Sequence, residues 1–368
     1  MKNQNSDNSS RRSFLKKSSL AGLGLTSALM FSCEQPKQQE EKKEFGKLNE
    51  SSKKLLTLFN LKYPFFQAAP GGGELAKAIA KAGGMGCLQF TWSSPDESYE
   101  WLQELNEETN GNYFANYILH FEPKSMDKVL EAGCRNFQFS WGLPSQEVIS
   151  KIRNAGGKFG IQVSSKKNAE KALELKPEFL ICQGLEAGGH IQATQYNEYA
   201  LPQVLEVAGE VPVLVSGGIS TGEDIRAAIH NGAAGVVMGT RFISTKESNL
   251  ADIYRQKLLE AGENSTVYTN CFNQEWNAMH RVLRTSTFLN WEAEGCPLNG
   301  NKPREGEVIG KTPWGGDIQM YSGRRPVEGD TGDLESMCMY AGEGVGKIND
   351  IPSAAELIER LWKEFENK

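Results

Sequence analysis

The chain has 368 residues, 39% of them hydrophobic, and 38 glycines, a composition that allows one large core or two smaller ones. Its formal net charge of −6 argues against nucleic acid or an acidic membrane surface as the main partner, because phosphate-rich partners select basic surfaces. A small neutral or anionic substrate is compatible with this composition.

Residues 1–33 have the layout of an export signal. A twin arginine, Arg11 and Arg12, precedes an apolar stretch over 20–31 that is too short to span a bilayer comfortably. The stretch runs into MFSC, which resembles a lipobox, so we predict a twin-arginine lipoprotein signal peptide with Cys33 acylated. A plain signal cleaved elsewhere is the alternative. We expect a periplasmic or cell-envelope lipoprotein that meets the membrane only through this anchor.

A flexible tether is predicted over 34–57, because most of this stretch is charged or polar and lacks the apolar residues that would order it. Loss of residues 1–32 removes five basic residues and one acidic residue, which leaves a net charge of −10 on the mature chain. The body of the protein is therefore distinctly acidic.

From residue 63, short apolar runs alternate with amphipathic stretches that end in glycine, the pattern of repeated βα units. Eight strands are predicted, over 65–69, 85–90, 113–119, 136–141, 158–163, 179–184, 212–218 and 235–240. Their number favours a (β/α)8 TIM barrel over 58–264. An open doubly wound sheet is the alternative, since counting strands does not show closure. Ser220 and Glu223 form an S-x-x-E signal for the start of the helix between the last two strands.

The regular alternation stops near residue 264. Residues 265–345 are rich in Gly, Trp, Asn and charge and show few clear strands, and an amphipathic helix is predicted over 353–365. We predict that 265–368 form a helical and irregular C-terminal appendage that packs on the barrel. Whether this appendage covers the barrel mouth is left open by the sequence.

The last two predicted strands end in Ser216-Gly217-Gly218 and Met238-Gly239-Thr240. In a TIM barrel the active site lies at the C-terminal ends of the strands, and the loops after the last two strands commonly bind phosphate. Glycines let backbone N–H groups approach a phosphate, and a following helix N-terminus favours negative charge. These segments predict a phosphate-containing ligand; tight turns without a ligand are the alternative.

The sixth predicted strand ends in QGLEAGGH, which places Gln183 at the strand end and His190 after two glycines. A neutral imidazole at the functional face suits proton abstraction, so we predict that His190 is catalytic. A structural histidine held by the backbone is the alternative.

The other histidines are weaker candidates. His120 ends the third strand, His280 reaches the site only if the appendage folds over the mouth, and His230 is expected at the surface. No set of His, Cys, Asp or Glu has metal-ligand spacing, so no metal is predicted.

Taken together, these segments resemble the nitronate monooxygenase family, also called 2-nitropropane dioxygenase-like proteins. The segments that carry the resemblance are YPFFQAAPGGGELAKAIAKAGGMG, QGLEAGGH, PVLVSGGIS, GVVMGTRFISTKES and MYAGEGVGKINDI. The resemblance implies an FMN-dependent TIM barrel that oxidises alkyl nitronates or nitroalkanes with dioxygen. The partners expected are therefore a small-molecule substrate and dioxygen, and the net charge already argues against nucleic acid.

The resemblance assigns roles to single residues. It implies flavin-binding positions at Asn116, Gln183 and Gly188, and a base or substrate-orienting group at His190. It implies a phosphate cradle formed by Gly217, Gly218, Val237, Met238, Gly239 and Thr240.

One loop departs from the family pattern. The stretch from Gln67 to Leu75 is shorter than usual and lacks a methionine, so the substrate need not be a nitronate. A flavin-dependent enoyl-thioester reductase that uses NAD(P)H is similar in the sixth-strand motif and is the enzymatic alternative. A lipoprotein that binds a flavin or phosphate ligand without turnover is the third reading. The sequence does not indicate the oligomeric state.

Overall fold

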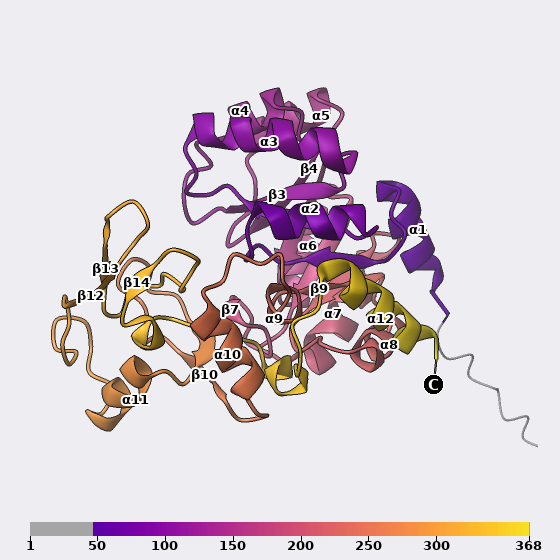
Figure 1. Cartoon of the computed structure of the whole chain (residues 1–368). Helices are drawn as coiled ribbons and strands as arrows, with labels where there is room; N and C mark the ends of the chain where they lie inside the picture. The colour runs from indigo at the N-terminus through magenta and orange to yellow at the C-terminus, as the bar shows by residue number, and fades with distance from the viewer. Residues whose placement is uncertain (1–46, 368) are drawn as a thin grey trace, which may run out of the picture. The chain divides into compact units, whose positions relative to one another are not determined.

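The computed structural model describes residues 47–367 (Figure 1). The signal peptide predicted over 1–33, the acylation site Cys33 and most of the tether lie outside these residues and stay predictions. Within 47–367, no helix is both long and apolar enough to cross a membrane.

Eight parallel strands form the centre of the molecule, in the order β1-β9-β8-β6-β5-β4-β3-β2. They are β1 (Phe65–Gln67), β2 (Gly86–Gln89), β3 (Tyr113–Ile118), β4 (Asn136–Ser140), β5 (Lys158–Val163), β6 (Phe179–Gln183), β8 (Val213–Ser216) and β9 (Gly235–Met238). The two end strands also meet, because Gln67 donates its backbone N–H to Met85 O at 2.9 Å and Met85 donates to Phe65 O at 2.9 Å. The predicted (β/α)8 barrel is confirmed, and the open sheet is excluded.

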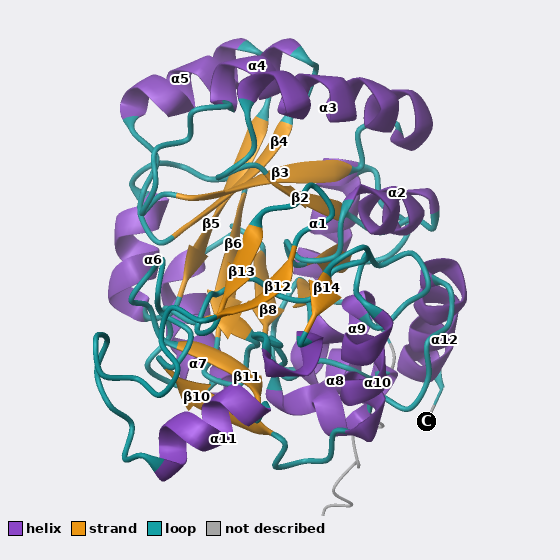
Figure 2. Cartoon of the chain, turned by 60° about the vertical axis from the view of Figure 1, so that its left-hand side comes forward, coloured by secondary structure: helices purple, strands orange, loops and turns teal. Residues whose placement is uncertain are grey.

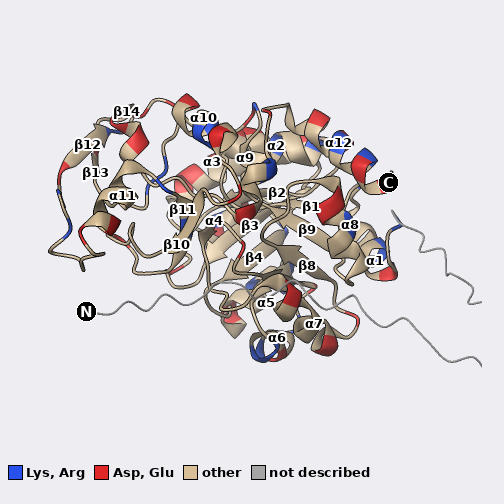
Figure 3. Cartoon of the chain, turned by 90° about the horizontal axis from the view of Figure 1, so that it is seen from below, with Lys and Arg blue, Asp and Glu red and all other residues tan. Residues whose placement is uncertain are grey.

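Helices surround the strands (Figure 2). Those that connect successive strands are α2 (Gly73–Lys81), α3 (Pro95–Thr109), α4 (Met126–Glu131), α5 (Gln146–Asn154), α6 (Lys166–Leu173), α7 (Asn197–Ala208) and α8 (Gly222–His230). Charged residues gather on the helices and loops (Figure 3), whereas seven of the eight barrel strands contain none and β5 begins with Lys158. The interior of the barrel is therefore uncharged.

The start of α8 lies one residue later than its sequence signal suggests. Thr221 is the N-cap and forms a capping box with Asp224, in place of the predicted pair Ser220 and Glu223. Asp224 also accepts the backbone N–H of Ser220 at 2.9 Å. The overlapping S-x-x-E and T-x-x-D patterns both predict a capping box, so only the backbone conformation decides which one forms.

The tether predicted over 34–57 ends earlier in the structure, because α1 (Glu50–Phe59) occupies the end of that range. Leu55 and Phe59 are buried in one cluster with residues from inside the barrel, and the Phe59 ring lies 5.5 Å from that of Phe179. The Asn49 side chain donates to Ile229 O and Ala233 O, before the start of β9. Because these partners are far away in sequence, composition alone did not reveal this helix, which packs at the N-terminal end of the barrel.

The last helix belongs to the outer layer of the barrel. α12 (Ala354–Glu366) packs between α8 and α2, in the place of the eighth barrel helix (Figure 1). The close approach needs Gly222, whose N–H donates to the Glu364 carboxylate at 2.8 Å and where a Cβ would overlap Glu364. The predicted boundary at 265 therefore does not separate the final helix from the barrel.

The region between β9 and α12 contains more strands than the sequence suggests. Its helices are α9 (Thr240–Ile243), α10 (Asp252–Glu260) and α11 (Ser286–Ala293), with short 3-10 turns η1 (Leu334–Ser336) and η2 (Glu343–Lys347). Its strands are β10 (Thr266–Thr269), β11 (His280–Leu283), β12 (Val308–Lys311), β13 (Asp317–Gln319) and β14 (Thr331–Gly332), so the prediction of a helical and irregular appendage is incomplete. None exceeds four residues, which is too short for a clear alternating pattern.

Candidate active site

The pocket at the C-terminal ends of the barrel strands brings together every predicted site residue. It has a volume of ≈ 320 Å³, within the range of about 300–1,000 Å³ that is typical of small-molecule sites. Its lining includes Asn116, Gln183, Gly188, His190, Gly217, Gly218, Val237, Met238, Gly239 and Thr240. The sequence predicted that these residues meet, and the structure places them around one cavity.

A ring of amide side chains forms the floor of the pocket. Each of the first six barrel strands contributes one: Gln67, Gln89, Asn116, Gln138, Gln162 and Gln183. Three members lie level in the sheet, since Gln89 pairs with Asn116 and Asn116 pairs with Gln138. Uncharged groups that both donate and accept hydrogen bonds suit the edge of a heteroaromatic ring. Sequence reasoning found only Asn116 and Gln183; the missed signal is that each of these six strands contains an amide residue, and β4 contains a second one, Asn136.

The two predicted amides have different roles. The Gln183 side chain holds the following loop, because its Nε2 donates to His190 O at 3.2 Å and its Oε1 accepts from Gln192 N at 3.0 Å. The Asn116 side chain is buried and makes no hydrogen bond within residues 47–367. Its amide is therefore available to a ligand.

A glycine cradle forms one wall of the pocket. Gly217 and Gly218 have φ of 118° and 71°, conformations that side-chain-bearing residues rarely adopt. Gly342 and Gly344 join them from the C-terminal segment, and Gly342 donates its N–H to Thr240 Oγ1 at 3.0 Å. The sequence predicted the first pair but did not assign the second pair to the site.

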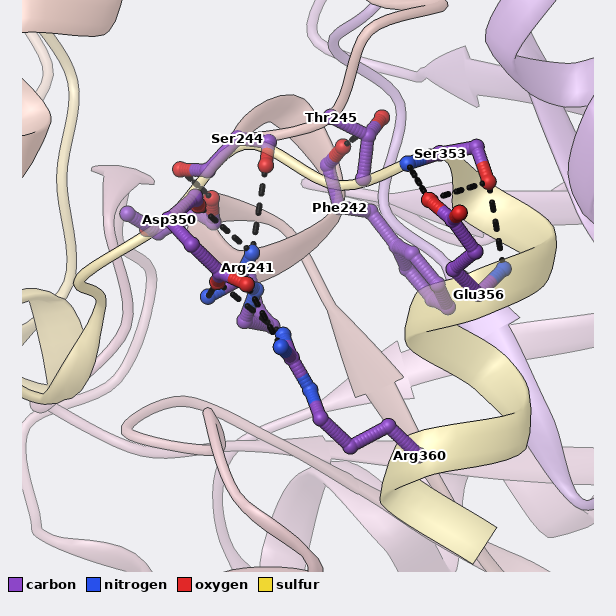
Figure 4. Close-up of polar contacts among 9 residues, drawn as sticks. Arg241, Phe242, Ser244, Thr245, Asp350, Ser353, Glu356 and Arg360 are labelled. Carbon is purple, nitrogen blue, oxygen red and sulfur yellow. Dashed lines mark hydrogen bonds and ion pairs between the residues drawn. The ribbon is translucent and has the colours of Figure 1, made fainter.

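An ion-pair network holds the segment that follows Thr240 in place (Figure 4). Arg241, which directly follows Thr240, is buried, contacts Asp350 at 3.3 Å and donates to Asp350 O at 3.0 Å. Asp350 in turn pairs with Arg360 of α12 at 2.5 Å. These arginines hold the pKa of the Asp350 carboxyl below its usual value, with Arg360 the larger cause. The arginine in the MGTRF segment thus joins the cradle to the final helix.

His190 lies over the pocket on the short strand β7 (Gly189–His190), which pairs with β11. Its ring stacks near Trp276, with centroids 4.4 Å apart, and lies 5.5 Å from His280. Burial, with a smaller contribution from His280, lowers the pKa of His190 to about 3. The imidazole is therefore neutral at pH 7, and its nitrogens make no hydrogen bond in the described part of the chain.

The appendage does reach the mouth, since its residues Arg325, Tyr340 and Gly342 line the pocket. It also supplies Trp276 and His280, whose rings lie next to that of His190. Trp276 lies between His190 and His120, and its ring centroid is 4.6 Å from that of Trp141. His280 Nε2 accepts from Phe272 N at 3.2 Å, and Nδ1 lies 2.9 Å from Ala278 O, so both ring nitrogens are engaged. His280 is therefore a structural residue. His230 is exposed, as predicted.

No metal centre is found in the described residues, where no group of three or more His, Cys, Asp and Glu side chains is arranged to hold an ion. Every cysteine in this part of the chain is free, and all but Cys296 are buried.

A family model described as nitronate monooxygenase matches residues 122–364, well over half of the chain. The chain belongs to the nitronate monooxygenase family. A probable nitronate monooxygenase of Bacillus subtilis is 24% identical to it over 367 residues, which cover 86% of this chain and 99% of that protein. As a member of this family, the protein is an oxidoreductase of the flavin-dependent type.

This chain is also similar to proteins that carry other names. The (3aS,4S,5R,7aS)-5-hydroxy-7a-methyl-1-oxo-octahydro-1H-indene-4-carboxyl-CoA dehydrogenase of Mycobacterium tuberculosis is 28% identical over 339 residues, covering 83% of this chain and 94% of that protein. The solved structure of FabK from Thermotoga maritima matches with a TM-score of 0.71 and 27% identity, covering 85% of this chain and 95% of that one. Proteins similar to this chain therefore carry the names of more than one reaction.

Proposed function

We propose that the protein binds FMN and oxidises alkyl nitronates with dioxygen. The observation that carries this proposal is the joint arrangement of the glycine cradle, the ring of amides and His190 around one pocket. Such a pocket fits a phosphate at one end and a flat heteroaromatic ring over the strand ends.

The residues present fit FMN. Backbone N–H groups at Gly217 and Gly218 would hold the phosphate, where a Cβ would approach Glu186 or Ala187 closely. The free Asn116 amide would contact the ring, and so would other members of the amide ring. Bound FMN would supply the redox chemistry, taking electrons from the substrate and passing them to dioxygen.

The state of His190 favours one form of the substrate. A histidine with a pKa of about 3 is a weak base at pH 7, so it is poorly suited to remove a proton from a neutral nitroalkane. A nitronate has already lost that proton. We infer that His190 orients the nitronate through its neutral imidazole, and that Trp276 and Trp141 keep water away from it.

The experiment begins with an absorbance spectrum of the purified protein. Flavin bands, or their appearance after FMN is added, are expected, followed by oxygen uptake with propane-2-nitronate in the absence of NADH. His190→Asn should keep the flavin and lose activity towards the nitronate by about 10-fold or more if it orients the substrate. A colourless protein that takes up no FMN would remove the proposal.

A second candidate is a flavin-dependent oxidoreductase acting on a thioester, such as an enoyl-thioester reductase using NAD(P)H. The observation that favours it is the 28% identity to a protein named as a carboxyl-CoA dehydrogenase. NADH-dependent turnover of an acyl-CoA, without oxygen uptake on propane-2-nitronate, would support this candidate. Flavin binding without either activity would support a non-catalytic binder.

We also propose that the protein is exported by the twin-arginine route and anchored through Cys33. This proposal is supported by the sequence of residues 1–33 alone. That route carries folded proteins, so FMN would be inserted before export. Replacement of Arg11 and Arg12 by lysine should retain the protein in the cytoplasm.

A further inference from the structure

Arg325 is the only charged side chain among the residues that line the pocket in the described part of the chain. It lies between β13 and β14, close to Gly323 and Tyr340 at the pocket wall. The remaining lining consists of apolar residues, glycines, hydroxyls, amides and the neutral His190. A single positive charge therefore faces the cavity of a protein whose overall charge is negative.

The guanidinium of Arg325 makes no hydrogen bond within the part of the chain that the structure describes. Of all the arginines in residues 47–367, it is the one without a hydrogen bond or ion pair, and its Nε is buried and unsatisfied. Arg325 is half-buried, and the fully buried arginines are paired: Arg241 with Asp350, and Arg281 with Glu343 at 2.8 Å. A charged group that is removed from water without a partner is destabilising. We therefore expect a ligand to supply the missing hydrogen-bond acceptor.

Neighbouring groups are already engaged. Asp330 accepts from Arg324 Nη2 at 2.7 Å and from Val327 N at 3.0 Å. The Tyr254 hydroxyl donates to Tyr340 O at 2.5 Å, and the Tyr340 hydroxyl donates to Gly323 O at 2.8 Å. None of these groups makes a hydrogen bond or an ion pair with Arg325, although the Asp330 charge favours its charged form. An acceptor within hydrogen-bond distance of the guanidinium can therefore come from a molecule in the pocket.

We propose that Arg325 binds an oxyanion of the molecule that occupies the pocket. This inference rests on the proposed function and deepens it, because a nitronate carries its negative charge on two oxygens in a plane. That geometry matches the paired N–H donors of a guanidinium, as a carboxylate does. The FMN phosphate presents the same chemistry, and the experiment separates the two sources.

The test compares Arg325→Met and Arg325→Lys with the parent protein. Arg284→Met is the matched control, because Arg284 pairs with Glu292 at the surface, outside the pocket. Without ligand, Arg325→Met should unfold at the same or a higher temperature than the parent, since it removes an unpaired charge. Arg325→Lys keeps the charge but loses the two-donor geometry, so it should retain part of the binding.

Binding is measured with FMN, with riboflavin, which lacks the phosphate, and with isobutyrate, a carboxylate close in shape to propane-2-nitronate. A Kd for FMN raised about 10–100-fold in Arg325→Met, with riboflavin unchanged, would identify the phosphate as the oxyanion. Alternatively, the Kd for FMN stays unchanged while the Kd for isobutyrate and the KM for propane-2-nitronate rise by the same factor. That result would identify the substrate as the source of the oxyanion. If all three ligands bind Arg325→Met as they bind Arg284→Met, the inference is overturned.

Failure of the proposed function gives a different result. If the parent protein binds no flavin, its thermal stabilisation by inorganic phosphate and by isobutyrate still tests Arg325. Loss of that stabilisation in Arg325→Met alone would support the oxyanion site without FMN. Equal responses of the parent and the variant would overturn it.

Discussion

His190 shows how burial sets the chemistry of one side chain. Its sequence context indicated a residue at the functional face, and the structure confirms that location. The tertiary structure also surrounds the ring with Trp276, His280 and Tyr340, and the loss of water lowers its pKa to about 3. This low pKa is the basis of our proposal that His190 orients an anion and does not act as a base.

This pKa predicts how stability depends on pH. The folded-state pKa of His190 is about 3 against an ordinary value of 6.5, so between these values the unfolded chain binds a proton that the folded chain does not. As the pH falls from 6.5 towards 3, the free energy of unfolding should decrease by up to about 1.4 kcal/mol per pH unit from this group.

His190→Asn should remove this contribution. Urea unfolding of parent and variant at several pH values measures it, with the difference at pH 8 as the internal reference for any loss of packing. Parallel curves for parent and variant below pH 6.5 would contradict the assigned pKa.

Single residues also show the limit of sequence reasoning. Asn116, Gly217 and Gly218 were identified because they lie in recognisable segments. Gln67, Gln138 and Arg325 were not, because a lone polar residue in a strand or a loop has no local feature that marks it. Their role depends on which side chains meet across the barrel and which lack a partner.

At the scale of elements, the βα loops position the glycines that we propose to bind phosphate. Gly239 offers a cleaner test than the two glycines of the preceding loop, because its φ of −101° is open to any residue. A Cβ at Gly239 would meet Ala68 Cβ at 3.5 Å, an ordinary contact. A methyl group there should leave the fold intact and change only the space offered to a ligand.

Gly239→Ala should therefore weaken FMN binding by about 10–100-fold, because the methyl group prevents close approach of the phosphate to the backbone. Its thermal unfolding should match that of the parent. Gly73→Ala is the control, since a Cβ at Gly73 has no neighbour within 4 Å and lies outside the pocket. Equal FMN affinity in both variants would show that the phosphate lies elsewhere.

On the scale of the whole molecule, the region between β9 and α12 completes the site. The pairing of β7 with β11 ties the loop that carries His190 to this region, and Arg281 of β11 donates to Leu185 O at 2.9 Å. Trp276, from the same region, packs against the His190 ring. A barrel without this region would leave His190 exposed to water.

Trp276→Ala should raise the pKa of His190 from about 3 towards 6.5, because burial is the larger cause of the lowering and the Trp276 ring lies 4.4 Å from the imidazole. Titration of the histidine ring protons by NMR measures the change. Trp314→Ala, at a tryptophan that is 76% exposed, is the matched control. An unchanged titration in Trp276→Ala would mean that other groups keep water from the ring.

The sequence by itself determined the eight strands, the positions of the glycines at their ends, the histidine after the sixth strand and the family. These features are local, since apolar periodicity, glycine and short motifs need only a few neighbouring residues. Only the tertiary structure decided that α1 and α12 complete the barrel, that one amide from each of six strands meets in one ring, and that Arg325 faces the pocket unpaired. Those features arise from contacts between residues far apart in the chain, where the choice of partner depends on the packing of the whole fold.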